Sequence, residues 1–184
     1  MCDQLGIDER RKIFLYPTDF ISPASTVIPP NMNEAICRCL LRVMKRYPDY
    51  TLVIKLHPSP LERMEDYKKW VEEEAVNNAI VVKDANTYKM EAISSLVITP
   101  VSTVALETMF WKRPMVLINF PNGEMWIKRS DADRSVKDAR IGVSVYKEAA
   151  LEAAIEKAMT DKGYLEGIHE RQADFIRRYM GEMD

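Results

Sequence analysis

The stretch 96-LVITPVSTVALE-107 contains the pattern that decides the fold. Leu96 to Thr99 is a continuous apolar run of the kind that forms a buried strand. Pro100 ends the run, and helical spacing then predicts a helix from Thr103 to Trp111. A strand that leads through a tight turn directly into a helix is the repeating unit of a parallel sheet.

The same alternation of strand and helix continues on both sides of this stretch. Further apolar runs predict strands at 13–16, 51–56, 79–82, 115–119 and 141–145. Helical spacing predicts helices at 32–44, 61–75, 88–95, 147–160 and 165–179, the last two separated at Gly163. Because the strands are continuously apolar, helices should cover both faces of the sheet. We therefore predict an α/β fold for residues 1–184 as a single domain: a Rossmann-like, doubly wound parallel sheet of about six strands.

The composition excludes several functional classes. The net charge of the 184 residues is −2, which does not give the broadly basic surface that nucleic-acid binding needs. No apolar run approaches the roughly 20 residues of a membrane span, and charges between Asp3 and Lys12 exclude a signal peptide. Three cysteines without metal-ligand spacing favour a reduced, cytoplasmic setting.

The helix predicted to begin at Thr103 is a candidate phosphate site. The first turn of a helix presents unpaired backbone N–H groups and the positive end of the helix dipole. Ser102 and Thr103 add hydroxyl donors, and Glu107 lies one turn beyond Thr103 on the same face, where it can accept hydrogen bonds from a ribose. The alternative is a Ser/Thr cap followed by a surface glutamate. The spacing alone leaves both open.

A second candidate is His57, which follows the predicted strand 51–56 and precedes Pro58. Ligands of open α/β sheets bind beyond the carboxyl ends of the strands, so the imidazole can meet a phosphate there. The alternative is a histidine that caps its own loop. Lys55 lies two residues earlier, on the same face of the strand. It is either a second phosphate contact or a lysine that snorkels to water, and we favour the latter.

Other polar residues follow the strand ends. Thr18, Asp19 and Ser22 come after the first strand and are either contacts for phosphate or sugar or turn formers. Trp126 either stacks on a base or sugar or anchors its own loop. No carboxylate pair has a plausible metal-ligand spacing, so we expect no bound metal.

Three segments together resemble a known family. Residues 13–19 (IFLYPTD), 53–58 (VIKLHP) and 96–114 (LVITPVSTVALETMFWKRP) are similar to the C-terminal, donor-binding domain of GT-B glycosyltransferases. The resemblance extends to capsule and teichoic-acid enzymes such as CDP-glycerol glycerophosphotransferases, capsule Kdo transferases and polysialyltransferases. Those enzymes bind the donor's phosphates with a His-Pro motif and a later Ser-Ser or Ser-Thr motif. The resemblance implies that His57, Ser102 and Thr103 are phosphate ligands and Glu107 a ribose ligand.

The implied function is donor binding in a glycosyltransferase of surface polysaccharide synthesis. The donor would be a nucleotide-activated sugar or CDP-glycerol, used as substrate with no further cofactor, and His57 would stabilise charge on the leaving phosphate. We expect the N-terminal acceptor domain to come from elsewhere, as a further domain or a partner subunit, and this domain alone to be inactive. The full enzyme could associate peripherally with a membrane. The alternatives are a UDP-sugar 2-epimerase-like domain and a non-catalytic nucleotide-binding or interaction module.

Overall fold

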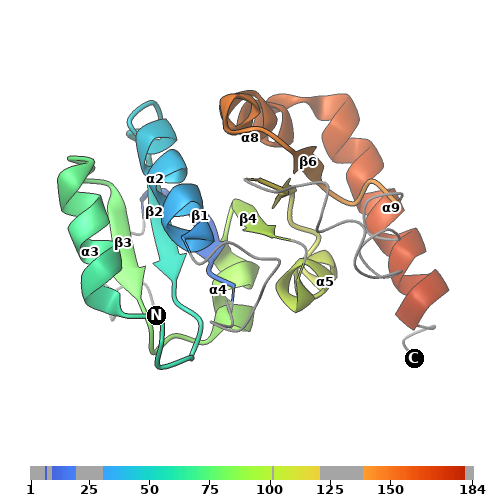
Figure 1. Cartoon of the computed structure of the whole chain (residues 1–184). Helices are drawn as coiled ribbons and strands as arrows, with labels where there is room; N and C mark the ends of the chain where they lie inside the picture. The colour runs from blue at the N-terminus through green and yellow to red at the C-terminus, as the bar shows by residue number, and fades with distance from the viewer. Residues whose placement is uncertain (1–6, 8–9, 20–30, 101, 121–138, 181–184) are drawn as a thin grey trace. The chain divides into compact units, whose positions relative to one another are not determined.

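The computed structural model of the chain describes residues 7, 10–19, 31–100, 102–120 and 139–180. Its elements are shown in Figure 1. The chain divides into two compact units, Met1–Ser95 and Leu96–Asp184. We describe the two units separately, and the single domain expected for residues 1–184 stays a prediction. Within the described ranges, no helix combines the length and apolar character of a membrane-spanning segment.

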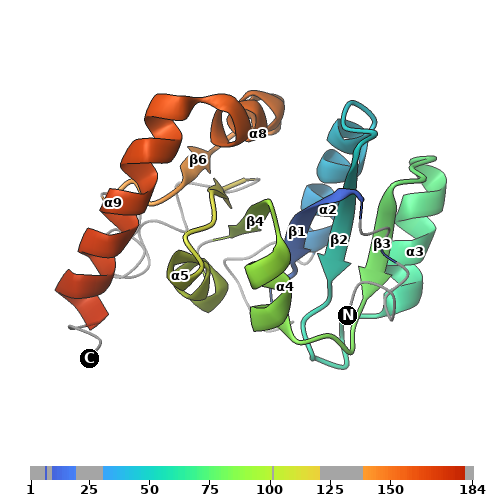
Figure 2. The same ribbon diagram turned by 180° about the vertical axis from the view of Figure 1, so that it is seen from behind.

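The first unit is a three-stranded parallel sheet with helices on both faces. Its strands are β1 (Lys12–Pro17), β2 (Tyr50–Lys55) and β3 (Ala79–Val82), and β2 pairs with both neighbours. Its helices are α2 (Met32–Met44), α3 (Met64–Glu73) and α4 (Thr87–Ile93). Figures 1 and 2 show α2 and α3 on one face of these strands and α4 on the other. This placement buries both faces of β1 and β2, which explains their continuous apolar sequences.

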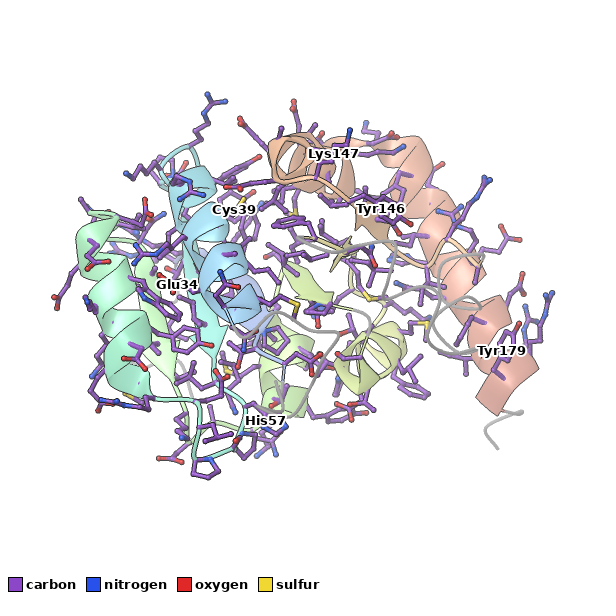
Figure 3. All side chains as sticks on the ribbon, viewed as in Figure 1. Glu34, Cys39, His57, Tyr146, Lys147 and Tyr179 are labelled. Carbon is purple, nitrogen blue, oxygen red and sulfur yellow. The ribbon has the colours of Figure 1, made fainter. Side chains whose placement is uncertain are left out.

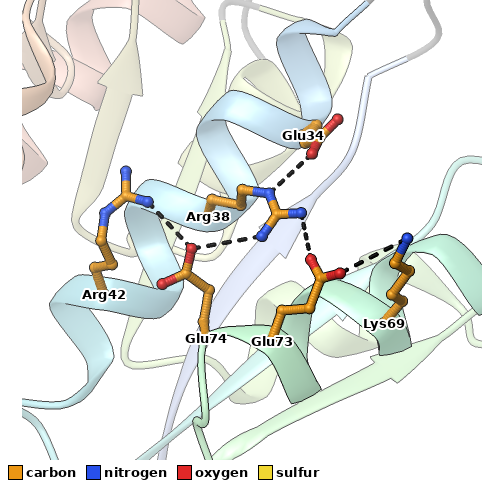
Figure 4. Close-up of polar contacts among 6 residues, drawn as sticks. All are labelled: Glu34, Arg38, Arg42, Lys69, Glu73 and Glu74. Atoms are coloured by element: carbon orange, nitrogen blue, oxygen red, sulfur yellow. Dashed lines mark hydrogen bonds and ion pairs between the residues drawn. The ribbon is translucent and has the colours of Figure 1, made fainter.

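Side-chain polar contacts join neighbouring helices and strands of the first unit. The Asn78 side-chain nitrogen donates to the carbonyls of Met44, Tyr47 and Tyr50 at 3.3, 2.9 and 3.0 Å, and so ties the end of α2 to the start of β2. On the outer surface, ion pairs join α2 to α3 (Figure 4), with Arg38 and Arg42 on one helix facing Glu73 and Glu74 at the end of the other. These pairs lie at the surface with partly exposed side chains, so each adds little stability.

The second unit repeats the design with another three parallel strands. The strands are β4 (Leu96–Pro100), β5 (Met115–Ile118) and β6 (Val143–Val145), with β5 paired to both. The helices are α5 (Thr103–Phe110), the 3₁₀ turn η1 (Glu148–Ala150), α8 (Leu151–Thr160) and α9 (Lys162–Met180). Side chains of α5, β5 and α9 form a buried apolar cluster that includes Met109, Leu117 and Phe175. The Gln172 side chain of α9 donates to the carbonyls of Arg113 and Ile141 and joins the helix to the sheet.

The strand order is β3-β2-β1-β4-β5-β6, which is the order of the Rossmann fold. The predicted α/β fold with a parallel sheet of six strands is therefore confirmed.

Two predicted helix boundaries are wrong. The break between the last two helices is not at Gly163, which lies inside α9, but at Asp161. There Asp161 Oδ1 accepts a hydrogen bond from the Tyr164 N–H at 3.0 Å, and this bond satisfies one of the first-turn donors of α9. The other error is at α3, which begins at Met64 and not at Leu61, because residues 59–62 form a hydrogen-bonded turn.

Candidate functional site

His57 lies two residues beyond the end of β2, at the carboxyl edge of the first unit's sheet (Figure 3). Two hydrogen bonds fix its position. Its backbone N–H donates to Thr18 Oγ1 at 2.8 Å, and its Nδ1 accepts from the Ser59 N–H at 3.1 Å. The predicted strand-end placement is correct. The loop-capping alternative is also seen, because Nδ1 caps the turn that begins at His57.

The Nδ1 contact decides which nitrogen carries the imidazole proton. An Nδ1 that accepts a hydrogen bond from a backbone N–H uses its lone pair, so the neutral ring carries its proton on Nε2. Nε2–H is therefore a hydrogen-bond donor at a fixed orientation. A phosphate oxygen is a suitable acceptor for such a donor.

Thr18 joins the loop after β1 to the loop after β2. It is 6% exposed, and its backbone N–H donates to the Lys55 carbonyl at 2.9 Å. Its hydroxyl oxygen accepts from the His57 N–H at 2.8 Å. The structure thus brings the predicted residues Thr18 and His57 into direct contact. The predicted contact of Thr18 with a phosphate stays a prediction.

A buried polar network lies beneath this pair of loops. Tyr67 donates its hydroxyl hydrogen to one oxygen of Glu62, and Asn33 Nδ2 donates to the other at 2.9 Å. Asn33 Nδ2 also donates to the Asp19 carbonyl at 2.9 Å. Burial, and next the hydrogen bond with Glu62, raise the pKa of Tyr67 well above its usual value. The hydroxyl therefore stays protonated and keeps donating.

The sequence gives no signal for this network. Asn33 and Glu62 are separated by 29 positions, and Tyr67 occupies an apolar position of a helical pattern. Only the packing of α2 against the turn before α3 reveals their contact. The network fixes both loops from below and makes them a rigid support for His57.

Two lysines support the same loops. Lys83 Nζ donates to the carbonyls of Ser59 and Glu62 at 3.1 and 2.7 Å and closes the turn between them. Lys55 is 4% exposed, and its Nζ donates to the Leu56 carbonyl at 2.7 Å. Burial lowers the pKa of Lys55. The favoured expectation that Lys55 snorkels to water is therefore wrong, because its ammonium group is held inside the unit.

The second candidate motif lies in the other unit, where β4 leads into α5 as predicted. Ser102 occupies the N-cap position in an extended conformation, but its side chain makes no capping hydrogen bond. Its Oγ lies 3.3 Å from Thr99 Oγ1. Ser102 is thus the N-cap residue, as the cap alternative expects, but its hydroxyl does not cap the helix; the Ala105 N–H of the first turn donates to the Ser102 carbonyl at 3.0 Å.

The remaining predicted residues fall as follows. Thr103 is exposed and Glu107 is half-buried, and both lie on α5. Their predicted contacts with phosphate and ribose stay predictions. Ser22 and Trp126 lie outside the described residues, as does Val101. Among the described residues, no group of three or more His, Cys, Asp or Glu side chains has the geometry of a metal site.

No protein-family model matches the chain, and no curated protein is similar enough to match it. Solved structures do match. The wall teichoic acid polymerase TagF superposes with a TM-score of 0.68 over 97% of this chain and 41% of its own, at 17% identity. UDP-GlcNAc 2-epimerase from Neisseria meningitidis, bound to UDP-GlcNAc, gives 0.60 over 98% and 47%, at 13% identity. A mutant of S. aureus TarM, in complex with Fondaparinux, alpha-GlcNAc-glycerol and UDP, gives 0.63 over 92% and 33%, at 13% identity.

The chain has a GT-B-like, Rossmann-type fold. It spans less than half the length of each of these three structures. At these identities the likeness concerns the fold alone, and it agrees with the fold expected from the three sequence segments.

Proposed function

We propose that the chain is the donor-binding domain of a glycosyltransferase that uses a nucleotide-activated sugar or glycerol phosphate. The observation that carries the proposal is the fixed imidazole of His57. Its Nδ1 accepts from the Ser59 N–H and its backbone N–H donates to Thr18 Oγ1, so the ring is held in place at the carboxyl edge of the sheet. Ligands of this fold class bind at that edge.

Each motif has a separate role in the proposal. In the first unit, His57 Nε2–H donates to a phosphate oxygen of the donor, and Thr18 positions the His57 loop and contributes to phosphate binding. In the second unit, the first turn of α5 with Ser102 and Thr103 binds phosphate through N–H groups and hydroxyls. Glu107, one turn further along α5, accepts from the ribose hydroxyls.

These residues act on the charge that develops during transfer. When the bond between the transferred group and the nucleotide phosphate breaks, negative charge accumulates on the leaving phosphate. A preorganised Nε2–H donor and a helix N-terminus stabilise that charge without rearranging. A bound nucleotide donor also agrees with the relatives in fold, because the epimerase structure contains UDP-GlcNAc and the TarM structure contains UDP.

The proposal extends to surface polysaccharide synthesis in a cytoplasmic setting, with an acceptor domain supplied by further sequence or by a partner subunit. TagF, a wall teichoic acid polymerase, supports this extension through its similar fold. The transfer reaction itself needs the acceptor, so the chain alone should bind donor without turning it over.

The test is calorimetric titration of the chain with CMP, CDP, UDP and GDP. His57→Ala and Ser102→Ala should each weaken binding of the preferred nucleotide about tenfold or more, the effect expected on losing one hydrogen bond to a charged group. His169→Ala is the matched control, because His169 is the other histidine of the chain and is exposed on α9. If no nucleotide binds to the folded chain, donor binding by this domain is wrong and the interaction-module alternative takes its place.

A second candidate is a UDP-sugar 2-epimerase-like activity, which the epimerase structure supports by its similar fold. Such an enzyme converts a UDP-sugar without any acceptor. Incubation with UDP-GlcNAc alone separates the two candidates, since new sugar isomers would form only in the epimerase case.

A further inference from the structure

A pocket of about 310 Å³ lies in the second unit, between the β6 segment and helices α8 and α9. Arg140 and Ser144 line it from the β6 segment, Lys157 from α8, and Tyr164 and Arg171 from α9. The proposed donor-binding role uses none of these residues.

The charged side chains that line this pocket are all positive. Three of its lining side chains are cations, namely Arg140, Lys157 and Arg171, and none of the described lining residues carries a carboxylate. Within the described ranges, the three cations also take part in no ion pair with an acidic side chain. Uncompensated cations that converge on a concavity concentrate a positive potential there.

Tyr164 holds two of the cations in place. Lys157 Nζ lies 5.9 Å and Arg171 Cζ 5.8 Å from the centre of the Tyr164 ring, both within cation–π range. Burial raises the pKa of Tyr164, so the ring stays neutral beside the two cations. The aromatic wall therefore adds no negative charge that would cancel the cations.

Gly167 makes room for Arg171. A Cβ at position 167 would lie 2.6 Å from Arg171 Nη1, so the guanidinium reaches back over the glycine on the same helix. Arg171 Nε donates to the Arg140 carbonyl at 3.0 Å, which fixes the plane of the guanidinium. The terminal nitrogens of Arg171 remain as paired donors, the arrangement that suits a phosphate group.

We propose that this pocket binds a small phosphorylated ligand whose phosphate or diphosphate group lies against Arg140, Lys157 and Arg171. The pocket volume is in the range of small-ligand sites. Three cations match the charge of a diphosphate, and the Ser144 hydroxyl offers a further donor. The pocket shares no lining residue with the proposed nucleotide contacts at His57 and α5, and the proposal does not depend on them.

The experiment is an NMR titration of the ¹⁵N-labelled 184-residue chain with pyrophosphate, in a His57→Ala background that removes a proposed competing contact. The amides of Gly142 and Gly167 report on the pocket, since Gly142 lines it and Gly167 lies under Arg171. Acetate at equal ionic strength is the control for general anion effects. Pyrophosphate should shift both amides saturably, and acetate should not.

Matched variants test the cause of the binding. Arg171→Gln should raise the Kd for pyrophosphate about tenfold or more, whereas Arg178→Gln removes the same charge from an exposed position of α9 and should leave it unchanged. Gly167→Ala keeps every charge but displaces the Arg171 guanidinium. It should weaken binding while raising the melting temperature, because alanine is the better helix former.

Two results would overturn the proposal. One is the absence of saturable shifts at Gly142 and Gly167 in a chain that melts cooperatively. The other is an equal loss of affinity in Arg171→Gln and Arg178→Gln, which would mean that pyrophosphate responds only to the general charge of α9.

Discussion

Replacing Thr18 by valine should specifically loosen the loop that carries His57. Valine keeps the shape of threonine but removes the hydroxyl that accepts the His57 N–H at 2.8 Å. An N–H left without an acceptor costs about 1–3 kcal/mol when it is buried, and the bond between His57 and Thr18 is partly buried. A local loss of about 1–2 kcal/mol corresponds to a roughly 5- to 30-fold larger open fraction.

Amide hydrogen exchange measures that open fraction directly. The His57 amide should exchange about 5- to 30-fold faster in Thr18→Val than in the wild type. The Leu56 amide is the internal control, because it donates to the Val82 carbonyl at 2.8 Å through a bond that the substitution does not touch. Thr18→Ser keeps the hydroxyl and should behave like the wild type at His57. Equal acceleration at His57 and Leu56 would refute the reasoning, because it would indicate a general loss of stability in place of one lost contact.

Three further predictions concern buried groups of the first unit. Burial lowers the pKa of Lys55 in the folded chain below 10.5, its ordinary value in the unfolded chain. At a pH between the folded and the unfolded pKa, the unfolded chain therefore binds more protons than the folded chain. The unfolding free energy of the wild type relative to Lys55→Met should therefore rise with pH over this interval in urea titrations, and parallel pH profiles would contradict this. Burial raises the pKa of Cys37 to about 12. In a Cys2→Ser background a thiol reagent should label the chain only after unfolding, so rapid labelling of the native protein would be inconsistent with the buried thiol. Asn78→Ala removes the side-chain nitrogen that binds three carbonyls between α2 and β2. It should lower the unfolding free energy by about 1–3 kcal/mol, and an unchanged urea midpoint would show that these contacts add nothing.

The strands of this fold could be predicted because a strand that is buried on both faces has a continuously apolar sequence. Each strand is a continuous apolar run, and the predicted run at 79–82 coincides with β3. Helix ends were harder to predict, because they depend on side-chain hydrogen bonds that a sequence does not display. Asp161 is an example. Glycine is the residue type that more often interrupts a helix, so the sequence favours Gly163 as the boundary. The structure has the boundary at Asp161, whose side chain accepts a hydrogen bond from the Tyr164 N–H.

The candidate site was predictable only in its outline. The rule that ligands bind beyond strand ends led to His57 and Thr18. It could not indicate that these two residues bond to each other across 39 positions. Nor could it indicate the Asn33–Glu62–Tyr67 network, whose members come from two helices and the turn between elements. The expectation for Lys55 is wrong for the same reason, because snorkelling is the common behaviour of a lysine and only the packed structure shows that its ammonium group bonds to the Leu56 carbonyl.

The most direct test of the proposed function is the ¹H–¹⁵N spectrum of the two histidine rings during a nucleotide titration. His169→Ala assigns the signals, since the chain contains two histidines. In the free chain the neutral His57 ring should carry its proton on Nε2, because Nδ1 accepts from the Ser59 N–H. On addition of CDP or UDP, the His57 Nε2 signal should shift saturably while the His169 signals stay in place. If His57 does not respond to any of the four nucleotides in the folded chain, the account of His57 as a donor-phosphate ligand is wrong.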